Sequence, residues 1–179
     1  EELTKLFNKS KENPSKTVTL NRIRRSEGLF FKLLYECHKI LTYIFTGKLI
    51  KFGNYSCLPK EHAARLLKEA CIWSSFSGSV TKVISDRVSV PSIRGQRYFG
   101  PSQMNLFNLL IHSFSIIAVF KKSVIFRSIL FLIFYLFFIF NNLSVITLFP
   151  ALVVMIFLFL ILKTSSRENF QELNNSLDN

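Results

Sequence analysis

The chain has 179 residues, of which 49% are hydrophobic, and its formal net charge at pH 7 is +12. Residues 1–122 hold 20 Lys and Arg against 8 Asp and Glu, which accounts for the whole excess. Basic residues beside long apolar segments favour anionic lipid or a phosphorylated substrate as partner, and we expect no nucleic acid. Three widely spaced cysteines show no metal-binding pattern and are expected to be small buried thiols: Cys37, Cys57 and Cys71.

The N-terminal residues 1–19 are polar and rich in lysine, and we expect them to be flexible. The chain does not begin with Met, which we interpret as a sign that further residues precede it. A run of arginines follows at Arg22, Arg24 and Arg25. Such a run is usually a solvated face, but phosphate contact is an equal alternative here because a strongly apolar helix comes next.

That helix is predicted over 28–45, with Gly47 just after its end. Its polar residues Lys32, Glu36 and Lys39 are three and four positions apart, so they form one narrow stripe. The remaining surface is apolar. A helix with so wide an apolar face suits either the membrane interface or a protein core, and the pattern favours the two equally.

The following stretch is predicted to form a small mixed α/β part. A short strand is expected over 48–56 and a helix over 60–73. The small residues of 74–79 indicate a break, and 87–91 is typical of a strand.

A second amphipathic helix is predicted over 102–120. Its polar residues again form one narrow stripe: Asn105, Asn108, His112 and Ser115. Two lysines follow, and we interpret 102–122 as a second helix lying in the membrane interface.

Two apolar runs, 124–140 and 143–162, then flank Asn141-Asn142. A membrane-spanning helix needs about 20 apolar residues. The second run is long enough, and the first completes its length if Arg127 reaches back to the headgroups. We therefore predict a transmembrane hairpin over 123–163. The alternative, a hairpin buried in a soluble protein, is disfavoured because so short a chain has too little other apolar surface to cover it.

The charges around this hairpin predict its orientation. All 23 Lys and Arg lie on its terminal side, and the asparagine turn carries no charge. By the positive-inside rule both termini, including the tail 164–179, are expected in the cytoplasm. The chain is then an integral membrane protein, in the inner membrane if the source is bacterial.

The candidate binding residues are cationic, because the sequence has no glycine-rich phosphate loop, metal cluster or useful carboxylate pair. Guanidinium groups bind phosphate oxygens with two hydrogen bonds, and a helix N-terminus adds N–H donors. Arginines with a nearby serine occur at each predicted interfacial helix. They are Arg22, Arg25 and Ser26 before the first helix, and Arg94, Arg97 and Ser102 at the start of the second. Plain anchoring to headgroups is the alternative.

The order of several segments resembles the late part of the family 2 glycosyltransferases of the membrane-anchored, dolichol-phosphate-mannose-synthase-like type. The segments are Arg24–Lys32, Leu41–Gly47, Ile50–Lys60, Val88–Arg94 and Arg97–Leu106. The resemblance covers about residues 20–163. It implies an α+β fold in which 20–101 is the C-terminal part of a GT-A-like catalytic domain, followed by the membrane helices.

The resemblance also implies a function, which is transfer of a sugar from a nucleotide donor to a polyprenyl phosphate. The family's basic loop matches Arg22, Arg25 and Ser26, and its later Arg-x-x-Gly-x-Ser matches Arg97, Gly100 and Ser102, with Gln103 in place of a lysine. The family holds a divalent metal, Mg²⁺ or Mn²⁺, in a first half that this chain lacks, so no metal or cofactor is expected here and no catalytic residue is assigned.

The partners expected are therefore the lipid bilayer, the polyprenyl phosphate, the nucleotide sugar in the complete enzyme, and a second copy of the chain. The alternative function is a non-enzymatic membrane protein that docks anionic lipids through its basic cytoplasmic face.

Overall fold

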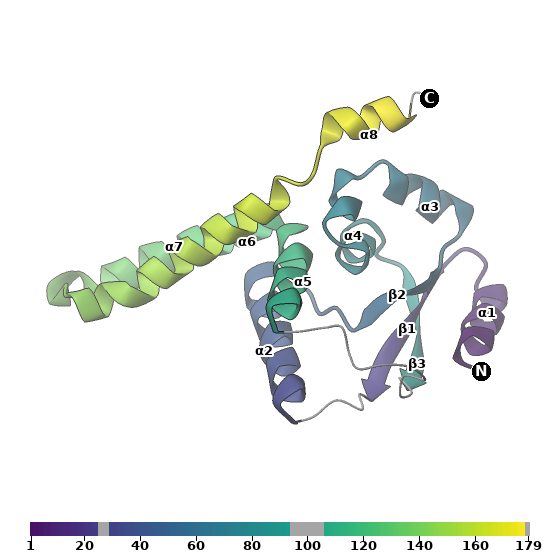
Figure 1. Cartoon of the computed structure of the whole chain (residues 1–179), viewed down its shortest axis with the longest axis horizontal. Helices are drawn as coiled ribbons and strands as arrows, with labels where there is room; N and C mark the ends of the chain where they lie inside the picture. The colour runs from purple at the N-terminus through teal and green to yellow at the C-terminus, as the bar shows by residue number, and fades with distance from the viewer. Residues whose placement is uncertain (25–28, 94–105, 178–179) are drawn as a thin grey trace.

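The computed structural model describes residues 1–24, 29–93 and 106–177. It has an α+β body from which a long helical hairpin projects (Figure 1). The body contains α1 (Glu2–Glu12), β1 (Thr17–Arg24), α2 (Leu29–Thr46), β2 (Phe52–Cys57), α3 (Lys60–Leu67), the 3-10 turn η1 (Ala70–Trp73), α4 (Phe76–Val83), β3 (Arg87–Ile93) and α5 (Leu106–Ala118). The hairpin and tail contain α6 (Lys121–Ile139), η2 (Phe140–Asn142), α7 (Val145–Ser165) and α8 (Phe170–Leu177).

The sheet has the strand order β2-β1-β3, with β1 antiparallel to β2 and parallel to β3. Side chains alternate across a strand, so the paired strands present two distinct faces. On one face Val18, Leu20 and Val90 form a buried cluster with Leu6 of α1. The α+β class expected from the sequence is confirmed, with a sheet of only three strands.

The N-terminal residues differ from the flexible segment that we expected. Glu2–Glu12 forms α1, and β1 begins at Thr17, inside the range 1–19. Leu6 is 4% exposed because α1 lies on the sheet, and ion pairs such as Lys9 to Glu12 at 2.7 Å support the helix. The lysine-rich composition concealed one apolar residue, Leu6, that the sheet buries.

The middle of the chain follows the predicted order of elements with one division. The helix predicted over 28–45 is α2, and Gly47 ends it with a φ of +70°. The strands predicted over 48–56 and 87–91 correspond to β2 and β3. The single helix predicted over 60–73 is divided into α3 and η1, because the backbone at Glu69 is extended.

The break predicted over 74–79 is limited to Ser74 and Ser75, which separate η1 from α4, and the remaining residues begin α4. Ser75 is the N-cap, and its Oγ accepts a hydrogen bond from the Gly78 N–H at 3.3 Å. A Cβ at Gly78 would lie 3.0 Å from Val119 Cγ2, just after α5. Small residues are required here because α4 packs closely on the end of α5, so the composition reflects packing and not a loop.

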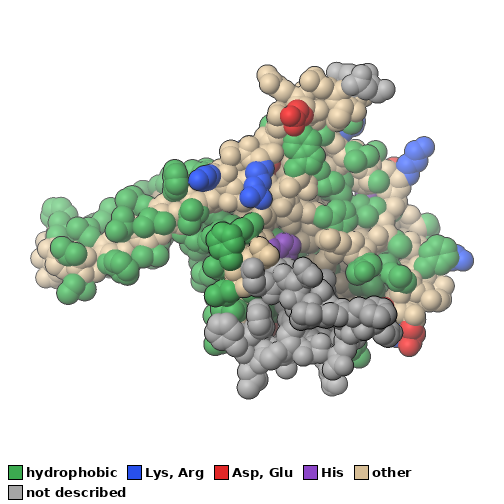
Figure 2. Space-filling view, viewed as in Figure 1, with side chains coloured by type: hydrophobic (Ala, Val, Ile, Leu, Met, Phe, Trp, Pro, Cys, Tyr) green, Lys and Arg blue, Asp and Glu red, His purple; other side chains and the backbone are tan. Residues whose placement is uncertain are grey.

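The predicted hairpin 123–163 corresponds to α6 and α7, two helices long and apolar enough to cross a membrane. In each, 11% of the most apolar window is buried inside the molecule, so neither is a core helix of the body. Figure 2 shows hydrophobic side chains along the hairpin and basic side chains near its base. Ser144 caps α7 in a capping box with Thr147 after the asparagine turn. Such a surface fits contact with a lipid bilayer.

The body meets the hairpin through α2 and α5, which run across its base (Figure 1) and pack against it. Ile117 and Ile161 are buried in this junction, beside rings of Phe45 and Phe157 whose centroids are 4.4 Å apart. Arg127, which was expected to reach back to the headgroups, makes a hydrogen bond to the body. Its Nη1 donates to the carbonyl oxygen of Ile44 at 3.2 Å, near the C-terminus of α2.

Candidate functional site

The structure places only one of the predicted site residues in a described element. Arg22 lies in β1, although its side chain is outside the described set. The other five predicted site residues lie outside the described residues altogether: Arg25, Ser26, Arg94, Arg97 and Ser102. Their expected contact with phosphate therefore stays a prediction.

The strands that precede the two predicted segments nevertheless end side by side at one end of the sheet. In the parallel pair, Arg22 of β1 lies opposite Ser92 of β3, and Arg24 lies opposite Ile93. The chain continues from these strand ends directly into Arg25 on one side and Arg94 on the other. The carboxyl ends of parallel strands are where open α/β sheets commonly bind ligands. Arg24 and Ile93, which are 69 positions apart in the sequence, thus end adjacent strands.

A cavity of about 390 Å³ lies beside these strand ends, and we call it the cationic cavity. Its lining combines two lysines, three neutral polar residues and two apolar ones: Lys39, Lys51, Asn21, Tyr35, Ser89, Ile23 and Pro91. No Asp or Glu lines it within the described part of the chain. Its volume falls in the range of roughly 300–1,000 Å³ that is usual for small-molecule sites.

Three parts of the fold supply this lining. Asn21 and Ser89 belong to the sheet face opposite the one covered by α1, because they alternate with Leu20 and Val90 along β1 and β3. Lys51 directly precedes β2 and is exposed. The cavity therefore occupies the open, polar end of the sheet's second face.

Helix α2 supplies the other two polar groups. Lys39 Nζ lies 5.3 Å from the centroid of the Tyr35 ring and 2.7 Å from an oxygen of Glu36. The Lys39 side chain is 26% exposed, while that of Glu36 is 57% exposed. An ion pair so open to water contributes little stability, so the lysine can exchange this partner for an anionic ligand.

The two sides of α2 have opposite characters. Thr42 and Thr46 are buried on the side toward the molecule, where Thr42 Oγ1 lies 3.3 Å from His38 Nδ1. On the outer side large apolar residues are exposed, at 63% for Leu33, 57% for Ile40 and 54% for Ile44. Cys37 is exposed on this same side, so the expectation of three buried thiols holds only for Cys71, since Cys57 is half-buried. A bilayer is the environment that fits the outer side.

Helix α5 exposes apolar side chains in its first turns but is buried in its last turns. Leu106, Phe107 and Leu110 in its first turns are exposed. Its last turns are buried in the junction, and the Ser115 Oγ donates to the Ile111 carbonyl oxygen at 2.9 Å. Only the first half of α5 therefore offers the outward apolar surface expected of the interfacial segment 102–122.

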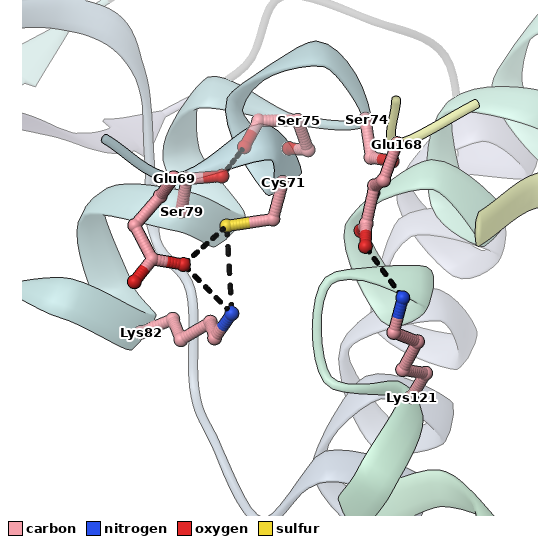
Figure 3. Close-up of polar contacts among 8 residues, drawn as sticks. All are labelled: Glu69, Cys71, Ser74, Ser75, Ser79, Lys82, Lys121 and Glu168. Atoms are coloured by element: carbon pink, nitrogen blue, oxygen red, sulfur yellow. Dashed lines mark hydrogen bonds and ion pairs between the residues drawn. The ribbon is translucent and has the colours of Figure 1, made fainter. Parts of the chain in front are cut away.

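A second polar cluster lies at the base of the hairpin (Figure 3). Lys121 Nζ contacts Glu168 Oε2 at 2.7 Å, and the Glu168 side chain is only 4% exposed. Lys82 Nζ lies 3.1 Å from Glu69 Oε2 and 3.7 Å from Cys71 Sγ. Burial raises the pKa of the Cys71 thiol, which therefore stays protonated near neutral pH and is a poor nucleophile. Glu168 also accepts a hydrogen bond from Ser74 Oγ at 3.5 Å, so this carboxylate ties the tail to both the start of α6 and the body.

The described residues do not fit a divalent metal. No group of three or more His, Cys, Asp or Glu side chains that could hold an ion occurs among them. Asp86 forms an ion pair with Lys16 at 3.3 Å at the start of the sheet. No step involving a metal is therefore assigned to this part of the chain.

The fold and cavity define an α+β protein with two helices able to cross a membrane and a cationic cavity beside the body's parallel strand ends. No protein-family model, curated protein or solved structure matches the chain. The resemblance to glycosyltransferases accordingly stays a prediction.

The sequence patterns did not identify the residues that line the cationic cavity as a site. Lys39 was identified only as part of the polar stripe of α2, and Lys51 had no pattern of its own. Asn21 and Ser89 are single polar residues within strands, where alternation alone could have placed them on the open face. Their convergence depends on the pairing of β1 with β3, which is separated from it by the whole middle of the chain.

Proposed function

We propose that this chain is the membrane-anchoring and acceptor-side part of a glycosyltransferase that moves a sugar from a nucleotide donor to a polyprenyl phosphate. The observation that carries the proposal is the arrangement around α2. A cavity with two lysines lies on one side of this helix, and exposed apolar side chains lie on the other. A lipid phosphate needs these two environments together, because its phosphate is anionic and its chain is apolar.

The hairpin supports the same proposal. Two membrane-length helices would keep the body at the membrane surface, where a polyprenyl phosphate presents its headgroup. We propose that both termini are cytoplasmic, which would place the basic body beside the cytoplasmic leaflet. The GT-A-like part would be the body with its three-stranded sheet.

In the proposed reaction, an oxygen of the acceptor phosphate attacks the anomeric carbon of the nucleotide sugar. A new bond forms between that carbon and the acceptor oxygen, and the bond to the donor diphosphate breaks. Residues of this chain hold the acceptor and offset its negative charge, which lowers the repulsion between the acceptor and the departing diphosphate. Arg22, Arg25 and Arg97 are proposed for this role, with Ser26, Arg94 and Ser102 beside them.

The second candidate is a non-enzymatic membrane protein that docks anionic lipids. It is favoured by the net charge of +12 together with the apolar outer side of α2, since neither feature requires a defined site. The two candidates differ in what the arginines do. In an enzyme a particular arginine is required for transfer, whereas in a docking protein each contributes about equally to lipid attraction.

The test uses Arg25→Ala and Arg97→Ala in the protein expressed with whatever coding sequence precedes this chain in its gene. Sugar transfer from nucleotide donors to a polyprenyl phosphate and flotation with vesicles are measured on the same preparations. We expect transfer to fall by at least about 100-fold while flotation is unchanged, because charge-assisted contacts to phosphate are lost. Weaker flotation of both variants on anionic vesicles, with no transfer by the unsubstituted protein, would favour the docking protein.

A further inference from the structure

Building on the function proposed above, we propose that Lys39 and Lys51 bind the phosphate of a lipid phosphate, whose hydrocarbon chain passes to the outer side of α2. The arginine segments were expected to make this contact. The lysines are an additional pair on other elements, one on α2 and one before β2.

The charge of the cavity selects an anionic ligand. Lys39 and Lys51 both line it, and no carboxylate of the described residues does. The carboxylate that pairs with Lys39 is Glu36, which is not part of the lining. A phosphate with its several acceptor oxygens can bind both ammonium groups at once, and such charge-assisted hydrogen bonds are stronger than neutral ones.

The neutral lining fits the same group. Asn21 offers an amide N–H₂ and Ser89 a hydroxyl as further donors to phosphate oxygens. Ile23 and Pro91 provide an apolar border, and Ile23 is 63% exposed. A phosphate with the first carbons of a chain fits a cavity of about 390 Å³, whereas a long chain has to continue outside it.

The outer side of α2 gives that chain a place to continue. Leu33, Ile40 and Ile44 are exposed on the side of α2 away from Thr42, which is buried against the molecule. A helix with its side chains is about 10–12 Å across. One lipid can therefore reach from the cavity around α2 to these residues, which a free phosphate or a phosphorylated sugar would not contact.

The experiment measures binding of farnesyl phosphate to the full chain in phosphatidylcholine nanodiscs, with farnesol and inorganic phosphate as competitors. The key variant is Lys51→Ala, and the matched control is Lys48→Ala, which removes the same exposed charge three positions upstream and outside the cavity lining. We expect Lys51→Ala to weaken binding about tenfold or more and Lys48→Ala to change it less than about twofold. Lys51→Arg should retain most of the affinity.

The remaining outcomes separate this assignment from the proposed function. Equal weakening by Lys51→Ala and Lys48→Ala, or no change with either, would overturn the role of the lysines. If binding then still depends on Arg25 or Arg97, the proposed function stands without a role for the two lysines. Competition by inorganic phosphate at the concentration of farnesyl phosphate would show a free-phosphate site and overturn the lipid part. Absence of farnesyl phosphate binding to the unsubstituted chain would contradict the proposed function itself.

Discussion

Helices α1 and α2 lie on opposite sides of the sheet, and their amphipathic faces point in different directions. On α1 the one buried apolar side chain is Leu6, which is 4% exposed and packs on Val18 and Leu20, whereas Leu3 and Phe7 are exposed. The large apolar residues of α2 are instead exposed on its outer side, while Tyr35 and Lys39 line the cationic cavity. Figure 1 shows α1 on the side of the body far from the hairpin and α2 across the hairpin's base.

We interpret this difference as two environments, which are the sheet for α1 and, under the function proposed above, a bilayer for α2. An amphipathic helix turns its apolar side away from water. For α1 the sheet provides an apolar surface, and burying Leu6 there stabilises the body. For α2 the hairpin indicates a bilayer nearby, so its apolar side can face lipid and its polar side can line a cavity. The same principle therefore produces a structural helix on one side and a helix suited to binding on the other.

The largest effect is expected when Leu6, the buried apolar side chain of α1, is shortened. Leu6→Ala should lower the free energy of unfolding of the body by about 2–5 kcal/mol, because it leaves a cavity in the buried cluster. Hydrogen exchange of the β1 and β3 amides checks this. The control on the same helix is Leu3→Ala, since Leu3 is 59% exposed and its loss should cost within about 0.5 kcal/mol. Equal effects of the two would mean that α1 does not rest on the sheet.

The next prediction concerns the hydrogen bonds that fix α2 to the hairpin. Arg127 Nη1 donates to Ile44 O at 3.2 Å, and Ser123 Oγ donates to Thr46 O at 3.4 Å. These bonds satisfy carbonyls at the C-terminus of α2, where a positive charge also complements the helix dipole. Arg127→Gln should raise hydrogen exchange in the last turn of α2 by an amount equivalent to about 1–2 kcal/mol. The matched variant Lys122→Gln should leave that turn unchanged.

Much of the fold was predictable because it depends on local pattern. The hairpin, α2 and the strand at 87–91 each have a periodicity, a length or a glycine that specifies them without reference to the rest of the chain. The errors arose where a residue's role depends on a distant partner. Gly78 and its neighbouring serines resembled a break because nothing local indicates that α5 packs against them.

The candidate site was predictable only in part for the same reason. The arginine segments were identified as cationic from the sequence, and the parallel pairing of β1 with β3 explains how they start from adjacent strand ends. Lys51 could not have been selected, since an isolated lysine beside a strand is usually a solvated residue. Its place in the cavity depends on β2 pairing antiparallel with β1.

A smaller effect is expected where α2 ends. Gly47 has a φ of +70°, and a Cβ there would lie 2.6 Å from Arg127 Nη2. Gly47→Ala should cost about 1 kcal/mol through backbone strain, and the flexible guanidinium can move aside. Thermal unfolding followed by circular dichroism in detergent measures the loss. Combining Gly47→Ala with Arg127→Gln should cost less than the sum of the two, because the added Cβ already displaces the guanidinium that donates to Ile44 O.

The least disruptive test of the comparison uses the thiol on the outer side of α2. With Cys57 and Cys71 replaced by Ser, Cys37 is the only thiol, and it is exposed beside Leu33 and Ile40. If this side faces lipid, a membrane-impermeant maleimide should label Cys37 slowly in intact membranes and rapidly after detergent is added.

Lys60→Cys in a background without other cysteines is the control, since this exposed position on α3 should be labelled once the reagent reaches its side of the membrane. Inverted vesicles meet that requirement for cytoplasmic termini, because they turn the cytoplasmic face outward. Equally fast labelling of the two positions would mean that water covers both sides of α2, and the contrast between α1 and α2 would then need a protein partner in place of the bilayer.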